Sequence, residues 1–297
     1  MPYTIAVVAD APIPSRSNRD LYYSIRAKGH VPRYIQISRL SIKLDNGDVS
    51  VISGEGKVNI DGVFLRSLGF LIDVEQFFHR VSVLRILEES GSRVVNSVDG
   101  LLKTRNKIET LAILARNKIP VPSTVSTESL LVAYNAAKSM GQVVIKPVQG
   151  SRGFGSVMVK DPDVAFQVAR SLLVVKKPIY VQRYIEKPNR DIRVMVINGE
   201  VFGCMYRIVS DGQWKTNIAQ GAYGKPCGNV DEELRELSIK ATEALGLTYA
   251  GVDIGEGPEG YVVFEVNGSP DWQELASVTM NNPAPRLVEV MESLIKR

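Results

Sequence analysis

The stretch "VVFEVNGSPDW", residues 262–272, decides how the C-terminal half of the chain is interpreted. Every second residue from Val262 to Val266 is apolar, which is the pattern of a β-strand with one buried face. Glu265 and Asn267 fall on the opposite face, two residues apart. A carboxylate and an amide on a strand otherwise suited to a core predict a polar site on that face.

The preceding stretch "YAGVDIG", residues 249–255, is a second strand, and the turn "EGPEG" between the two predicts a hairpin. Folding at this turn brings Asp253 beside Glu265. Two carboxylates at cross-strand distance repel each other unless a proton or a cation lies between them. The oxygen atoms of Asp253, Glu265 and Asn267 suit Mg²⁺, with phosphates and water completing its shell. We therefore predict a metal site here; the alternative is a merely solvated face.

A glycine-rich segment, "VVIKPVQGSRGFGSVMV" (residues 143–159), joins two further predicted strands. Gly150, Gly153 and Gly155 allow backbone N–H groups to approach a phosphate without a Cβ in the way. A Walker A loop or a dinucleotide fingerprint leads from a strand into a helix, and neither pattern is present. Lys146 lies on the strand that enters the loop, where its ammonium group can meet phosphate oxygens. The segment predicts a phosphate cover, or otherwise a glycine-rich hairpin without a ligand.

Composition narrows the class of protein. The chain has 297 residues, 44% hydrophobic and 23% charged, with a net charge of +4. These values are typical of a globular protein with two or three subdomains, and the scattered basic residues do not indicate a nucleic-acid binder. The N-terminus lacks signal-peptide features and no run reaches membrane-spanning length, so no membrane partner is expected. Cys204 and Cys227 lack metal-ligand spacing and cannot form a disulfide framework, so the reducing cytosol is the expected compartment.

The order of predicted elements indicates α/β and α+β architecture. Strand, helix and strand alternate from the N-terminus, which predicts a Rossmann-like parallel sheet over residues 1–98. From Gln142 onward, short strands and hairpins predict antiparallel sheets, with one hairpin turned at Asn198 and Gly199. We expect a central subdomain over residues 99–180 and a C-terminal subdomain over residues 181–297.

The order of motifs is specific. A Lys-bearing helix, "TRNKIET", precedes Lys146 and the glycine loop, followed by "VQRYIE", "RDIR", "WKTN" and the Asp253, Glu265 and Asn267 set. From Arg105 to Trp272, the chain resembles the ATP-grasp superfamily, in its ribosomal-protein-S6-modification-type α-L-glutamate ligase branch. The segments "RDIRVMVINGEVFGCMYRI", "WKTNIAQG", "ALGLTYAGVDI" and "EVNGSPDW" are most similar to the tetrahydromethanopterin:α-L-glutamate ligases of methanogens. The resemblance implies an ATP-grasp fold.

The resemblance also implies a role for each matching position. The residues expected to bind ATP are Lys107, Lys146, Gly150, Ser151, Gly153, Gly155, Ser156, Gln182, Arg183, Tyr184, Ile185 and Asp191. Those expected around the γ-phosphate and the acyl phosphate are Arg193, Lys215 and Asn217. The implied metal ligands are Asp253, Glu265 and Asn267, with two Mg²⁺ or Mn²⁺ ions expected.

Two positions depart from the family pattern. Arg183 stands where many relatives have Glu, and Lys215 where the ribosomal-protein type has Arg. The first leaves open which side chain holds the adenine or the ribose. Arg66, at the end of an apolar strand in "FLRSLGF", is a candidate substrate contact.

The implied reaction joins a carboxylate and an amine. An acceptor carboxylate attacks the γ-phosphate of ATP, and the amine of L-glutamate then attacks the acyl phosphate, giving an amide, ADP and phosphate. The acceptor that the resemblance implies is a carboxylate-bearing small molecule, tetrahydromethanopterin, and the alternative acceptors are coenzyme F420, ribosomal protein S6 or an amino-group carrier protein. A non-catalytic ATP-binding regulatory protein is a further alternative, against which the complete Asp253, Glu265 and Asn267 set argues. Linkage, number of glutamates, metal preference and homo-oligomerisation stay open.

Overall fold

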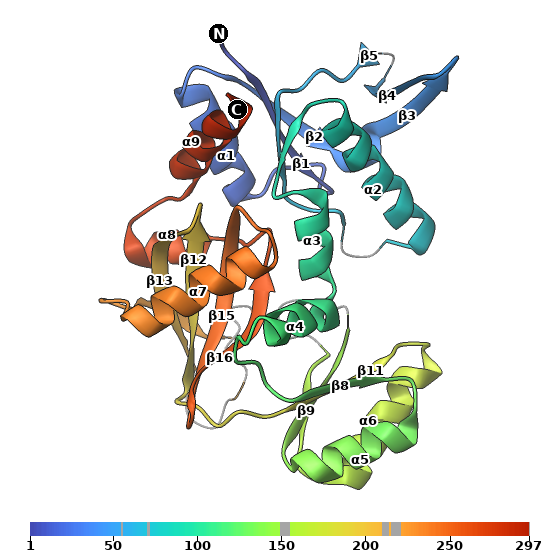
Figure 1. Ribbon diagram of the computed structural model, residues 1–297, viewed down its shortest axis with the longest axis vertical. Coiled ribbons are helices and arrows are strands. Elements are labelled where there is room, and N and C mark those ends of the chain that lie inside the picture. Colours follow the sequence, from blue (N-terminus) through green and yellow to red (C-terminus); the bar gives the residue numbers. More distant parts are fainter. Residues whose placement is uncertain (55, 70–71, 149–154, 210–213, 215–220, 297) are drawn as a thin grey trace.

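The computed structural model describes residues 1–54, 56–69, 72–148, 155–209, 214 and 221–296. Its strands form a four-stranded parallel sheet, a small three-stranded sheet beside it, a four-stranded central sheet and a five-stranded sheet. In Figure 1 the parallel sheet and its helices lie at one end of the molecule and the central sheet at the other, with the five-stranded sheet between them. The three larger sheets thus follow one another along the length of the molecule.

The N-terminal sheet has the strand order β2-β1-β6-β7, and all its pairs are parallel. Its strands are β1 (Thr4–Ala9), β2 (Val31–Gln36), β6 (Gly62–Leu65) and β7 (Arg93–Val95), and its helices are α1 (Arg16–Ala27) and α2 (Val74–Glu89). An antiparallel insertion consists of the 3-10 helix η1 (Ile37–Arg39), β3 (Leu40–Asp45), β4 (Asp48–Ser53) and β5 (Gly56–Lys57). This confirms the predicted Rossmann-like opening.

The central sheet has the order β10-β9-β11-β8, and its pairs are antiparallel. It contains β8 (Thr124–Thr127), β9 (Val143–Pro147), β10 (Val157–Val159) and β11 (Ile179–Arg183), with α5 (Leu130–Met140) and α6 (Pro162–Val174). Helices α3 (Val98–Arg105) and α4 (Lys107–Arg116) connect it to the N-terminal sheet. The Lys-bearing helix expected at "TRNKIET" is divided at Asn106, because the Asn106 side chain accepts hydrogen bonds from the backbone of residues 108 and 109 and so caps α4.

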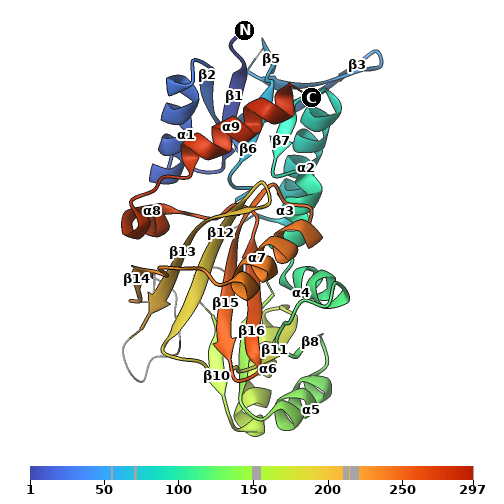
Figure 2. The ribbon, with the colours of Figure 1, turned by 60° about the vertical axis from the view of Figure 1, so that its left-hand side comes forward.

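The five-stranded sheet has the order β14-β13-β12-β15-β16 and is antiparallel throughout. It contains β12 (Arg190–Ile197), β13 (Glu200–Ile208), β14 (Tyr223–Pro226), β15 (Tyr249–Gly257) and β16 (Gly260–Asn267), with α7 (Glu232–Ala244). Figure 2 shows α7 along one face of this sheet. The predicted turn at Asn198 and Gly199 is confirmed, since both have positive φ, as a two-residue hairpin requires.

A β-bulge corrects the predicted alternation of the opening stretch. Asp253 pairs with Glu265, but the next pair is Ile254 with Val263, so β16 has one extra residue, Phe264. Val263 and Val266 are therefore the residues fully buried in the core, and the alternation of apolar residues from Val262 to Val266 does not place them on one face. Bulges are common beside active sites, where they redirect a side chain.

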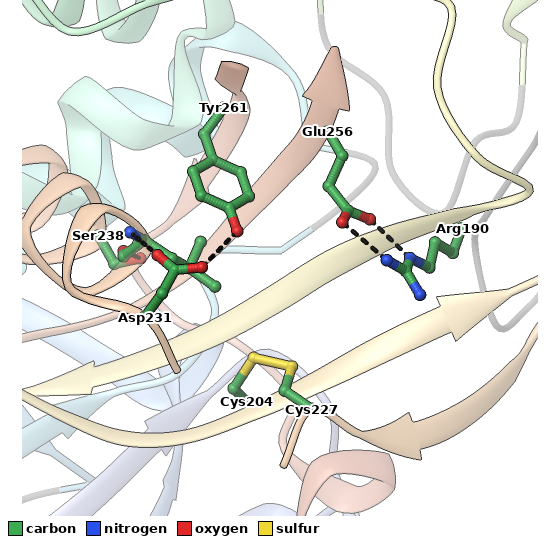
Figure 3. Close-up of a disulfide and its surroundings, with 8 residues drawn as sticks. Arg190, Cys204, Cys227, Asp231, Ser238, Glu256 and Tyr261 are labelled. Carbon is green, nitrogen blue, oxygen red and sulfur yellow. Dashed lines mark hydrogen bonds and ion pairs between the residues drawn. A yellow bond between two sulfur atoms is a disulfide. The ribbon is translucent and has the colours of Figure 1, made fainter. Parts of the chain in front are cut away.

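The two cysteines form a disulfide, contrary to the expectation of reduced thiols. Cys204 on β13 is bonded to Cys227, which directly follows β14, as Figure 3 shows. The backbone N–H of Cys227 also donates to the carbonyl of Cys204 at 3.2 Å. Sequence separation alone gave no sign of this pair, because the cysteines become neighbours only once β14 joins β13. The bond attaches the short edge strand to the rest of the sheet.

The last two described helices lead the chain back to the N-terminal domain, where the second of them packs against α1. They are α8 (Gln273–Thr279) and α9 (Ala284–Ile295), neither of which was predicted from the sequence. Apolar residues of α9, among them Leu287 and Met291, share a core with Leu21 and Ile25 of α1. Figures 1 and 2 show α9 beside α1, next to the N-terminal sheet. The C-terminal helix therefore completes the core of the N-terminal domain. Within the described parts of the chain, no helix is long and apolar enough to cross a membrane.

Asn96, fully buried directly after β7, links the N-terminal sheet to β15 and β16. Its amide nitrogen donates to the carbonyls of Tyr249 and Gly268 at 2.7 and 2.5 Å. Its carbonyl oxygen accepts from the backbone of Thr248 and Tyr249 at 2.7 and 3.1 Å. One side chain thus makes four hydrogen bonds between the two domains.

We expect Asn96→Ala to lower the free energy of unfolding by about 2–5 kcal/mol, because it leaves buried backbone groups without partners. Urea unfolding followed by circular dichroism measures the change. Asn117→Ala is the matched control, since the Asn117 amide donates to Ile113 at an exposed position. Similar unfolding midpoints for the two variants would contradict a linking role for Asn96.

Candidate active site

A row of charged side chains crosses the five-stranded sheet on the face opposite its apolar core. The strand register pairs Arg193 on β12 with Asp253 on β15, and Asp253 with Glu265 on β16. The neighbouring residues Val252 and Val266 point into the core on the other face. The cross-strand pairing of the two carboxylates, predicted from the sequence, is therefore confirmed.

Arginines balance the first of these carboxylates. Both oxygens of Asp253 accept from Arg193, and Oδ2 also lies 3.2 Å from Arg207 of β13. Arg207 in turn makes a bidentate pair with Asp191, at 2.7 and 2.9 Å. One network of two guanidinium groups and two carboxylates is thus formed by Arg193, Asp253, Arg207 and Asp191.

Burial and charge act in opposite directions on this network. Burial by itself raises the pKa of Asp253, but the guanidinium groups of Arg193 and Arg207 outweigh it and hold the pKa below its usual range. Burial likewise lowers the pKa of Arg207, yet the carboxylates of Asp253 and Asp191 hold it above the ordinary value. Asp253 and Arg207 are therefore both ionised at neutral pH.

A lysine faces the second carboxylate. Lys107 is the first residue of α4, where the Asn106 cap fixes it, and its Nζ donates to Glu265 Oε1 at 2.5 Å. The side chain of Lys107 is 13% exposed and that of Glu265 is 34% exposed. The partly open carboxylate lies at the border between α4 and the five-stranded sheet, where a ligand can reach it.

Lys146 of β9, in the central sheet, lies close enough to Lys107 and Glu265 for their charges to act on it. Its Nζ donates to Gln182 Oε1 at 3.2 Å and lies 4.6 Å from the ring centre of Tyr180. The Gln182 amide nitrogen donates to the hydroxyls of Thr124 and Tyr180, at 3.0 and 2.9 Å, which fixes its orientation. Burial lowers the pKa of Lys146 to about 8; the charge of Lys107 adds to this effect, and that of Glu265 opposes it.

This pKa predicts a pH dependence for phosphate binding. A bound polyanion favours the charged form of Lys146, so below about pH 8 the free protein already carries the proton that binding needs. Above that pH the proton has to be taken up, and we expect the KM for ATP to rise by up to about tenfold per pH unit.

Initial rates measured from pH 6.5 to 9.5 test this expectation, with Lys146→Arg as the comparison. Arg stays protonated over the whole range, so its profile is expected to be flatter above pH 8. Parallel profiles for the wild type and the variant would assign the pH dependence to another group.

The predicted metal ligands form no ordinary metal cluster. Among the described residues, no group of three or more His, Cys, Asp or Glu side chains is placed to hold a metal ion. Asp253 and Glu265 nevertheless supply two paired carboxylates, and Asn267 uses its amide nitrogen, not its carbonyl oxygen, to bond Gly251. This all-oxygen donor set fits Mg²⁺, provided that phosphates supply further ligands.

The other described residues that are predicted to bind ATP lie at the end of β11, directly after it, or just before β10. The backbone N–H groups of Arg183 and Tyr184 donate to the carbonyls of Ser123 and Gln142, which fixes the exit of β11. Ile185 follows in the link to β12, and Gly155 and Ser156 precede β10. Five predicted site residues lie outside the described residues: Gly150, Ser151, Gly153, Lys215 and Asn217.

Arg66 lies apart from this row, between the N-terminal domain and the loop after β16. It donates to Asn18 Oδ1 at 3.1 Å, to the Tyr249 hydroxyl at 3.0 Å and to the carbonyl of Pro270 at 2.7 Å. Its guanidinium also lies 4.4 Å from the ring centre of Trp272. These contacts join domains, and a contact between Arg66 and a substrate stays a prediction.

Arg207 is the residue of the network that the sequence did not reveal. A regular hairpin turned at Asn198 and Gly199 would place Tyr206 opposite Asp191. A second bulge, at Met195 and Val196, shifts the register so that Arg207 takes that place. A one-residue insertion of this kind leaves no reliable pattern in the sequence, whereas the alternation of Asp191 and Arg193 does.

Comparison with known proteins agrees with this geometry. Residues 104–291 match the family model of the RimK-like ATP-grasp domain. The chain is 30% identical to the tetrahydromethanopterin:alpha-L-glutamate ligase of Methanosarcina acetivorans, over 93% of this chain and 95% of that protein. It is 37% identical to the alpha-aminoadipate--LysW ligase LysX of Saccharolobus solfataricus, over 71% of this chain and 78% of that protein.

The fold has a solved counterpart. The ATP-grasp ligase PsnB, in complex with a minimal precursor, superimposes with a TM-score of 0.78 and is 22% identical, covering 99% of both chains. At this identity the likeness concerns the fold alone. It extends over the N-terminal sheet as well as the two sheets that carry the charged residues.

Proposed function

The chain belongs to the RimK-like ATP-grasp family and is an ATP-dependent, ADP-forming ligase, and from this premise we propose that it joins L-glutamate to a carboxylate of tetrahydromethanopterin. The observation that supports the site is the meeting of three elements. Glu265 of the five-stranded sheet faces Lys107 of α4, and the charges of both act on Lys146 of the central sheet. Two lysines and a carboxylate pair thus converge where the two sheets meet, and we assign the lysines to the phosphates of ATP.

In the proposed reaction, the acceptor carboxylate attacks the γ-phosphate of ATP, forming an acyl phosphate and ADP. Lys107 and Lys146 hold the phosphate oxygens, and Arg193, fixed by Asp253, neutralises charge that develops on the transferred group. The amine of glutamate then attacks the acyl carbon, and phosphate leaves as the amide forms. The protein orients the reactants and forms no covalent bond to them.

Asp253, Glu265 and Asn267 would hold Mg²⁺ or Mn²⁺, in one or two ions, which would supply further charge neutralisation at the phosphates. Arg193 and Arg207 hold the pKa of Asp253 below its usual range, so its carboxylate is ionised, as a metal ligand must be. ATP and a cytoplasmic setting are parts of the same proposal.

The test is phosphate release in the presence of ATP, Mg²⁺, L-glutamate and tetrahydromethanopterin, with the product mass measured in parallel. We expect release to require both co-substrates and the acceptor to gain the mass of one glutamate residue or more. ATP turnover that is indifferent to every added amino acid would contradict a ligase of this specificity.

The likeness to LysX favours a second acceptor class, an amino-group carrier protein. The same assay separates the two proposals. An intact-mass change on a carrier protein, with none on the pterin, would assign the chain to the second class. Coenzyme F420 and ribosomal protein S6 are tested as further acceptors in the same series.

A further inference from the structure

The N-terminal parallel sheet has a topological switch point between β1 and β6. From β1 the chain moves outward to β2, and it later returns to the other side of β1 to form β6 and β7. In sheets of this type, ligands bind beyond the carboxyl ends of the strands at the point where the order reverses. Here β1 ends before Asp10 and β6 ends before Arg66. The described active-site network lies elsewhere, on the five-stranded sheet.

Two arginines converge on the loop that follows β6. Arg80 of α2 donates to Asp10 Oδ1 at 2.5 Å and to the carbonyl of Leu68 at 2.6 Å. Arg105, the last residue of α3, donates to the carbonyl of Gly69 at 2.6 Å. A Cβ on Gly69 would lie 2.5 Å from the Arg80 guanidinium, so only glycine allows this close approach. The loop and two helices together hold both guanidinium groups in place.

Positive charge at this place exceeds the negative charge. Arg80 and Arg105 supply two guanidinium groups, whereas the one carboxylate bonded to them among the described residues is Asp10. The Nε of Arg105 is buried and has no hydrogen-bond partner among those residues. Burial, with the charge of Arg80 as the second cause, lowers the pKa of Arg105. An anion that binds between Arg80 and Arg105 would satisfy this buried donor and offset the excess of positive charge.

The site also lies within reach of the reacting groups. Arg105 and Lys107 are separated by Asn106 alone, so their Cα atoms are at most about 7.6 Å apart, since consecutive Cα atoms lie about 3.8 Å apart. Lys107 contacts Glu265 of the proposed ATP site. A small substrate can therefore contact Arg105 with one end while its other end reaches the phosphate.

We propose that Arg80 and Arg105, at the switch point, bind a carboxylate that the reaction does not consume, on either the acceptor or the incoming glutamate. The inference rests on the proposed function and adds to it a binding site and the chemical group that this site binds. The carboxylate that becomes the acyl phosphate has to lie at the γ-phosphate, so the group held here is a second one. Arginine suits this task, because its planar fork binds both oxygens of a carboxylate.

The experiment compares Arg105→Gln, Arg105→Lys and the wild type in full steady-state kinetics of phosphate release. We expect Arg105→Gln to raise the KM of one carboxylate substrate at least tenfold, with kcat changed less than threefold and the KM for ATP unchanged. Arg105→Lys keeps the charge but loses the fork, so its KM is expected between those of the other two. Arg85→Gln is the matched control, since Arg85 lies on the same helix as Arg80 and pairs with Asp99 at the surface.

The outcomes separate the sources of the carboxylate. A raised KM for L-glutamate alone assigns the site to the amine substrate, and one for the acceptor alone assigns it to the acceptor. Unchanged KM values for both, in a variant that melts like the wild type, overturn the proposal, as does an effect on ATP alone. If Arg105→Gln does not fold, Arg105→Lys decides on the same terms, with a threefold rise in KM as the threshold.

A binding measurement keeps this test independent of the proposed reaction. Calorimetric titration of the wild type and of Arg105→Lys with glutarate, a dicarboxylate without an amine, needs no turnover. Weaker binding by the variant supports the site even if no glutamate-dependent phosphate release is found, in which case the proposed function alone fails. Equal binding by both proteins, or none by either, counts against the site.

Discussion

Glu265→Gln is expected to keep its fold and to lose about a hundredfold or more in the rate of phosphate release. The change preserves the shape of the side chain and removes one negative charge from the carboxylate pair with Asp253. That charge is needed where Mg²⁺ and the phosphates of ATP are expected to bind, and an amide ligates Mg²⁺ less well than a carboxylate. Phosphate release with saturating ATP, glutamate and acceptor measures the loss.

The fold is expected to survive because Glu265 is partly exposed and its main partner is a single lysine. The loss of the Glu265 charge leaves Lys107 without its ion pair, so a small decrease in the melting temperature is expected. Glu259→Gln is the control, since Glu259 lies exposed in the turn of the same hairpin. If Glu265→Gln melted early and yet kept its rate per folded molecule, Glu265 would be structural and the metal assignment would be wrong.

Asp253→Asn is expected to lower the free energy of unfolding by about 3–5 kcal/mol, the cost typical of removing one partner from a buried ion pair. The substitution leaves the guanidinium groups of Arg193 and Arg207 with one carboxylate, Asp191, between them. Urea unfolding of the variant and the wild type measures this difference. Asp99→Asn is the control, because the surface pair of Asp99 with Arg85 is expected to contribute less than about 1 kcal/mol.

The difference in the free energy of unfolding between the wild type and Asp253→Asn is expected to depend on pH. Because the folded protein holds the pKa of Asp253 below its ordinary value, its charge stabilises the fold above that value and the contribution disappears as pH falls through the folded-state pKa. The difference between wild type and Asp253→Asn should thus be constant from about pH 5 to 7 and decrease in acid below about pH 4. A difference that stays constant into strong acid would mean that packing, not charge, accounts for the effect.

The carboxylate pair could be predicted from the sequence because its signals are local. The strands around Asp253 and Glu265 flank a short turn, and the polar residues alternate with core residues on each of them. The bulge at Phe264 could not be predicted, because the sequence does not show where one strand gains a residue over its neighbour. The pairing depends on this bulge: the register next to the turn, which pairs Ile254 with Val263, would place Asp253 opposite Phe264, and the extra residue brings Glu265 there instead.

Contacts between distant segments were the part that the sequence could not supply. The disulfide depends on β14 joining the edge of its sheet, and Arg80 and Arg105 meet only because α2 and α3 close on the same loop. Such contacts leave no periodic pattern in the sequence, because each of the residues that meet is an ordinary residue of its own helix or strand. Arg66 is a candidate substrate contact because of its position at a strand end; the structure places it at the domain border, and a substrate contact there stays a prediction.

The return of α9 to the N-terminal domain has a consequence for biosynthesis. Some of the residues that share a core with Leu21 and Ile25 of α1 belong to α9, which begins at Ala284. During translation at roughly 5 to 20 residues per second, the apolar surface of the first domain therefore stays uncovered for about 10 to 40 seconds after residue 98 is made. The N-terminal domain is thus completed only after α9 has been made, and until then a nascent chain exposes an apolar surface to which chaperones can bind.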